Sequence, residues 1–292
     1  MESSDDLPPE IAFSRGIPEL FDELATVAGY VRPVAMTDWF FALQKYLLES
    51  TPASLAHLEH NSGSGPDWLA RCRHGILSNV QEGLYSSLYH LTRVEQIESA
   101  MLAIAKRHAP NLAMRKGSGA GGGNSRALNA EYQAFAFAIR RTLEYLAVAA
   151  AAYFKTDCHS FRRLSAAVGS RGPENKSAAL QAFFITHLQS ISDVIPEDKH
   201  NDRSLRDRLA HWESVPAGSF SISRAPWGYD VALIGGGHDL PAFRPPPAKA
   251  DNSPEGGMVT YTALGPLLRD QFERVERTIY GVLDALDIRV PR

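Results

Sequence analysis

The sequence is poor in cysteine. Its 292 residues include two, Cys72 and Cys158, which lie far apart and form no Cys-x-x-Cys pair. Two isolated thiols cannot build a disulfide framework, and they are too few for a cysteine-rich zinc site. We therefore expect reduced thiols, and the sequence indicates no metal and no cofactor.

Long apolar runs are also missing. The longest, around residues 147–154, is short and rich in alanine, whereas a membrane-spanning helix needs about 20 apolar residues. Residues 1–6 are acidic and have no apolar core, unlike a secretory signal peptide. The sequence thus predicts a protein with no membrane partner and a cytoplasmic location.

The chain lacks a strong charge of one sign. Its formal net charge is −3, with 14 acids against 8 bases in residues 1–110 and 19 acids against 22 bases in residues 111–292. This balance excludes the strong positive field of a protein that coats nucleic acid, so any nucleic-acid contact should be local. A content of 44% hydrophobic and 22% charged residues is ordinary for a globular protein.

What the sequence does contain is helical periodicity. Apolar residues recur at steps of three and four, which predicts long helices near residues 127–153, 175–194 and 261–287. Helical patterns also fill much of residues 17–108, with separate helices expected over 68–91 and 94–108. The predicted fold class is all-α, an antiparallel four-helix bundle with an additional N-terminal helical region. The stripe of the first long helix consists of Leu128, Tyr132, Phe135, Ile139, Leu143, Leu146, Ala150 and Tyr153.

A glycine-rich stretch divides the chain. It contains a Gly-x-Gly-x-x-Gly string at Gly117, Gly119 and Gly122, but a dinucleotide site would need a strand before the string and a βαβ unit around it. The preceding residues have a helical pattern instead. We therefore predict a hinge or loop over residues 114–126, separating an N-terminal helical region (1–113) from a helical bundle (127–292).

Strand-like alternation is confined to one section before the last helix. Residues 219–223 and 229–234 alternate between polar and apolar types and are separated by Pro226-Trp227-Gly228. This pattern predicts a β-hairpin within an insertion that spans about residues 216–258.

The residues that are most suited to catalysis lie between the second and last bundle helices. Leu-Arg-Asp-Arg-Leu-Ala-His-Trp occupies residues 205–212. On a helix, Arg203, Asp207 and His211 are successive i,i+4 neighbours, so the Asp207 carboxylate can accept an N–H of the imidazole and orient it. Arg206 lies about 140° away around the helix and needs the helix start or a second subunit to reach His211. An oriented imidazole beside a fixed cation suits phosphodiester cleavage.

Arg206, Asp207 and His211 resemble the motif of the HEPN superfamily, in which an arginine followed by a polar residue precedes a histidine by four to six intervening residues. The resemblance extends over residues 127–292 in helix order. It implies a helical bundle that forms a homodimer and acts as a metal-independent endoribonuclease, often as a toxin or abortive-infection effector with an antitoxin or defence-system partner.

The resemblance assigns roles by position. It makes Arg206 and His211 catalytic and Asp207 the supporting polar residue. Arg203 and Arg208 could then hold RNA phosphates, and Trp212 could stack on a base or pack under the hairpin. Some HEPN toxins have a tyrosine two residues after the histidine, which a partner enzyme modifies. Glu213 stands there in this chain, so that form of neutralisation is not expected.

Two other classes of function remain open on the sequence. One is a non-catalytic helical module that binds RNA or protein, and the other is a regulatory protein with a small-ligand pocket between its halves. Among other histidines, His187 is expected on the buried seam of its helix, and His57 with His60 lacks the further ligands of a metal site. Cys158 is expected to be a buried thiol.

Overall fold

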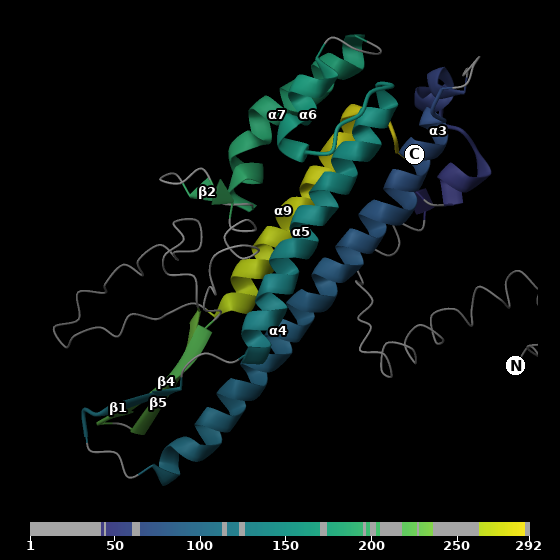
Figure 1. The fold of residues 1–292 in the computed structure, drawn as a ribbon. Coiled ribbons are helices and arrows are strands. Elements are labelled where there is room, and N and C mark those ends of the chain that lie inside the picture. Colours follow the sequence, from purple (N-terminus) through teal and green to yellow (C-terminus); the bar gives the residue numbers. More distant parts are fainter. Residues whose placement is uncertain are drawn as a thin grey trace, which may run out of the picture.

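The computed structural model describes residues 42–43, 45–59, 65–112, 116–122, 126–169, 174–194, 197–198, 203–204, 218–226, 228–235 and 263–289. Helices dominate these residues, and a small antiparallel sheet precedes the last helix (Figure 1). This arrangement confirms the prediction of a mainly helical chain with a β-hairpin. None of the helices in the described ranges is long and apolar enough to cross a membrane.

The longest helical segment runs through three elements without a break. α3 (Trp68–His74) continues through the π-helical segment η3 (Gly75–Val80) into α4 (Gln81–His108), and the residues at both junctions keep helical backbone angles. We expected two separate helices here. The chain stays helical because neither proline nor glycine occurs between residues 84 and 108.

α5 (Arg126–Tyr153) packs closely along this segment. Two glycines make the approach possible. A β-carbon at position 75 would lie 2.7 Å from the β-carbon of Ala149, and one at position 83 would clash with Thr142. All eight residues of the predicted α5 stripe are buried, as expected for a helix covered by neighbours.

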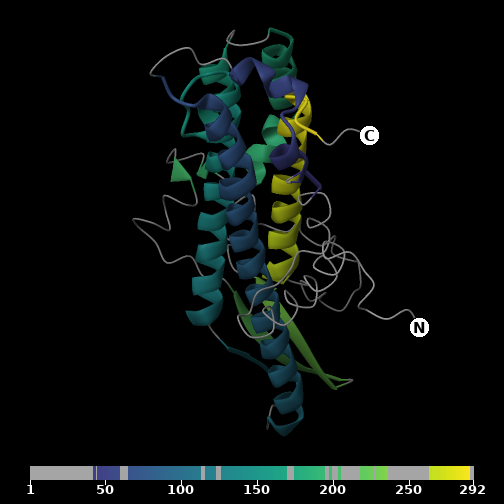
Figure 2. The same cartoon turned by 90° about the vertical axis from the view of Figure 1, so that its right-hand side faces the viewer.

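α9 (Leu264–Ala285) lies beside α4 and α5 and contacts both (Figure 2). Its predicted apolar face is buried from Leu264 to Leu286. α7 (Glu174–Val194) matches the predicted second bundle helix within one residue and packs against α9. A short helix between α5 and α7, namely α6 (Phe161–Val168), was not predicted.

One hydrophobic core joins the two halves of the chain. It extends from Leu43 through α4 and α5 to Ile288. The glycine-rich stretch therefore does not separate two cores, although we expected it to divide two regions.

Part of that stretch is a strand instead of a loop. β1 (Gly119–Gly122) pairs antiparallel with β4 (Gly218–Ala225), which pairs with β5 (Gly228–Gly235) as the predicted hairpin. A strand made of glycine and alanine shows no apolar alternation in its sequence, and its pairing uses only the backbone. The sheet packs on the end of α4 through Ile222, against Ala105.

Candidate functional site: the groove between α7 and α9

The predicted catalytic segment lies outside the described residues. This holds for Arg206, Asp207, Arg208, His211 and Trp212. Arg203 is described, and it belongs to the two-residue strand β3 (Arg203–Ser204). The prediction that Arg203 shares a helix face with Asp207 and His211 is therefore wrong, because its backbone pairs with β2 (Glu197–Asp198).

The β2–β3 pairing nevertheless fixes where the chain enters that segment. Ser204 is paired with Glu197, which follows the end of α7 by three residues. Paired residues of antiparallel strands lie about 5 Å apart. Ser204, the last described residue before that segment, therefore lies beside Glu197, shortly after α7 in the sequence.

A groove lies between α7 and α9. Its cavity volume is about 610 Å³, within the range of roughly 300–1,000 Å³ typical of ligand sites. The lining side chains come from one face of each helix: Ala179, Phe183 and His187 from α7, and Arg274, Arg277, Thr278, Gly281, Asp284 and Ala285 from α9.

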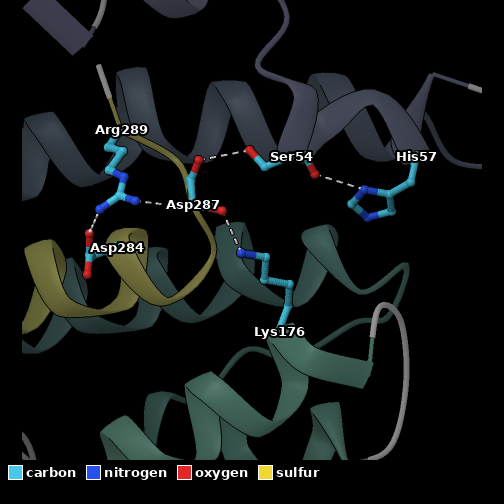
Figure 3. Close-up of polar contacts among 6 residues, drawn as sticks. All are labelled: Ser54, His57, Lys176, Asp284, Asp287 and Arg289. Carbon is cyan, nitrogen blue, oxygen red and sulfur yellow. Dashed lines mark hydrogen bonds and ion pairs between the residues drawn. The ribbon is translucent and has the colours of Figure 1, made fainter. Parts of the chain in front are cut away.

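Ion pairs fix one end of this groove (Figure 3). Lys176 Nζ lies 2.7 Å from Asp287 Oδ2 and so joins the start of α7 to the end of α9. Arg289 pairs with both Asp284 and Asp287, and the Ser54 hydroxyl donates to the backbone oxygen of Asp287. The hydrogen bond from Lys176 lowers the pKa of Asp287. The two helices are thereby held antiparallel.

The middle of the groove depends on a close contact between Phe183 and Gly281. A β-carbon at position 281 would clash with the Phe183 ring, so only glycine leaves room for it. The His187 ring stacks on Phe183 with centroids 4.7 Å apart and planes tilted by 36°. His187 is exposed, which corrects the prediction that it is buried on the helix seam.

The other end of the groove carries positive charge. Arg277 is 65% exposed, and its guanidinium lies 3.9 Å from Glu273, a loose pair at an exposed position. Arg274 is 2.7 Å from Asp270. The antiparallel course of the helices places this end toward the C-terminal end of α7.

No protein-family model, no curated protein and no solved structure matches this chain. In the described part of the chain, His187 forms no hydrogen bond to a carboxylate. An aromatic platform beside guanidinium groups is suited to binding a ligand, and we assign no chemical step to these residues.

A second polar cluster was missed because its members are far apart in sequence. His90 Nδ1 of α4 lies 2.7 Å from Glu131 Oε2 of α5, and Arg93 is 3.7 Å from the other oxygen of the same carboxylate. Only the α4–α5 packing brings these residues together.

The remaining candidates have structural roles. Both ring nitrogens of His57 are taken up by backbone oxygens, those of Ser54 at 2.9 Å and Tyr153 at 2.8 Å, so His57 is not free to hold a metal. Within the described ranges, no three His, Cys, Asp or Glu side chains gather as a metal site would require. The thiol of Cys158 is buried, as predicted.

Proposed function

We propose that this protein is a metal-independent endoribonuclease, with Arg206 and His211 as catalytic residues and Asp207 as the residue that orients His211. The observation that carries the proposal is this set of three within residues 205–212, between α7 and the β4–β5 hairpin of a mainly helical chain. The chemistry needs an acid/base, an orienting carboxylate and a fixed cation, and all three occur there.

The order of the described helices supports the proposal. α5 comes first, the short α6 and then α7 follow, the motif segment comes next in the sequence, and α9 closes the series after a β insertion. A HEPN-like four-helix bundle requires this order, with the motif on the third helix. In this proposal two copies form a homodimer that brings two motifs together, and α4 is an addition that packs on α5 and α9.

The proposed reaction uses only groups that this chain and the RNA supply. Neutral His211 removes the proton from an RNA 2′-hydroxyl, whose oxygen then attacks the adjacent phosphorus. Arg206 stabilises the negative charge of the phosphorane, and the bond to the 5′-oxygen breaks as that oxygen takes up the proton that His211 received. The products are a 2′,3′-cyclic phosphate and a 5′-hydroxyl. Arg203 and Arg208 would hold neighbouring phosphates, and Trp212 would stack on a base.

The test uses purified protein and a labelled RNA in the presence of EDTA. We expect cleavage, and we expect His211→Ala to slow it by about 100-fold or more, the effect of removing a general base. His159→Ala is the matched control, because His159 is exposed and lies in the loop before α6. An oligonucleotide with 2′-deoxyribose throughout should resist cleavage, because it lacks the attacking hydroxyl.

Loss of cleavage in EDTA, or full activity of His211→Ala, would contradict the mechanism. If the wild-type protein and the variant both bind RNA and neither cuts it, the protein is a non-catalytic RNA-binding module. In a toxin or phage-defence system, expression of the wild-type protein should arrest growth and expression of the variant should not.

A further inference from the structure

We propose that the groove between α7 and α9 binds a nucleotide of single-stranded RNA, with its base on the Phe183–His187 platform and its phosphate at Arg277. The inference rests on the proposed ribonuclease function for the choice of ligand, and it assigns a binding site outside the motif. Its basis is the chemistry of the lining and the position of the groove.

The platform offers stacking at an accessible position. The rings of Phe183 and His187 lie against each other with planes tilted by 36°. His187 is exposed, and Phe183 is partly buried against the core, which holds it in place. Bases of single-stranded RNA stack on such rings without regard to sequence. The edge of the Phe183 ring lies against Gly281, where a β-carbon would clash with it, so α9 also holds this ring in place.

The charge of the groove is distributed as the ligand requires. Arg277 stands about one helical turn from Gly281 on α9, and both residues line the groove. Arg277 lies 3.9 Å from Glu273 on the exposed surface, a pair that a phosphate can displace at small cost, and it also acts electrostatically on Glu276. The acid that lines the groove, Asp284, lies at the far end and pairs with Arg289.

The groove also lies close to the motif along the chain. His187 precedes the end of α7 by seven residues, roughly 10 Å along the helix axis. The β2–β3 pair follows that end of α7, with Ser204 opposite Glu197. In the sequence, the motif begins at the next residue.

The experiment measures binding apart from cleavage. A fluorescent single-stranded RNA with 2′-O-methyl riboses cannot attack its own phosphate, so its anisotropy reports binding alone. We expect the double variant His187→Ala/Arg277→Gln to bind about tenfold or more weakly. Arg277→Gln alone should reduce the slope of log affinity against log salt by about 0.7. The matched control is His159→Ala/Arg107→Gln, two exposed positions outside the groove.

A second variant addresses the platform itself. Gly281→Ala should move the Phe183 ring and weaken binding, and circular dichroism must show that the variant is folded. Wild-type affinity in both groove variants, or no binding of this RNA by the wild-type protein, would overturn the proposal. If the groove variants bind and cut RNA normally, the groove proposal fails while the ribonuclease stands. If the wild-type protein cuts no RNA but its binding of RNA depends on the groove residues, the ribonuclease proposal fails while the groove proposal stands.

Discussion

The Glu98 carboxylate of α4 accepts the backbone N–H of Gly265, at the start of α9, over 2.8 Å. Its other oxygen accepts the N–H of Leu264 over 2.7 Å. The first N–H groups of a helix have no partner within the helix. The N-cap residue here is Ala263, whose methyl group cannot accept a hydrogen bond. Glu98, which is 5% exposed, therefore caps α9 from another helix.

Glu98→Ala should destabilise the protein by about 1–3 kcal/mol, because it leaves two buried N–H groups without acceptors. Urea unfolding followed by circular dichroism measures the loss. Glu82→Ala, at an exposed position of the same helix, is the control and should leave the unfolding free energy almost unchanged. Equal stability of the two variants would show that Glu98 does not cap α9.

Gly83→Ala should be destabilising by about 1–3 kcal/mol, although alanine is the better helix former. The new methyl group would clash with Thr142 and force α4 away from α5, and this cost exceeds the gain of up to about 1 kcal/mol in helix propensity. Thermal unfolding measures the net effect. Gly65→Ala adds the same methyl group where nothing lies within 4 Å, and it should not lower the melting temperature. A more stable Gly83→Ala variant would disprove the close contact.

Glu276→Gln should stabilise the protein at pH 7 and have little effect at pH 4. Burial, with repulsion from Glu273, raises the pKa of Glu276 to about 6 from 4.5, against the opposing effect of Arg277. The folded state thus binds this proton more tightly than the unfolded state, so the contribution to stability is present below pH 4.5 and is lost as the pH rises through 6. Melting temperatures of the variant and of Glu273→Gln across pH 4–8 test the prediction, which fails if the variant keeps the wild-type pH dependence.

Cys72 should not react with thiol reagents in the folded protein up to pH 10. Burial raises the pKa of its thiol to about 12 and outweighs the nearby charge of Arg73, so almost no thiolate, the reactive form, exists below that pH. Mass spectrometry after treatment with iodoacetamide, with and without urea, measures the modification. Labelling of Cys72 in the absence of urea would show that α3 opens readily.

Apolar spacing was enough to predict the helices that bury a single stripe. α5 and α9 follow this rule along their whole predicted stripes. α7 follows it at Leu180 and Phe184 but not at His187, which is exposed. α6 was not predicted because its apolar stripe has only three residues, Phe161, Leu164 and Val168, and two arginines lie between the first two of them in the sequence.

Contacts between residues on different helices could not be predicted from apolar spacing. Arg269 of α9, for example, pairs with Glu95 of α4 through two bonds of 2.9 and 2.7 Å. The contact between Phe183 and Gly281 joins residues on different helices. Periodicity describes one helix at a time, and such pairs depend on how two helices meet. The roles of Arg206 and His211 stay predictions.

α9 supplies one whole wall of the groove, so during synthesis the groove cannot form until α9 has been made and has docked. α4 and α5 can associate as soon as both have emerged, but the contact that starts α9 joins residues 166 positions apart. Contacts between such distant residues form late and slowly. A nascent chain would therefore pass through a period in which α4 and α5 are paired and α7 has no partner for Phe183, so the proposed RNA site would come into existence only with the docking of α9.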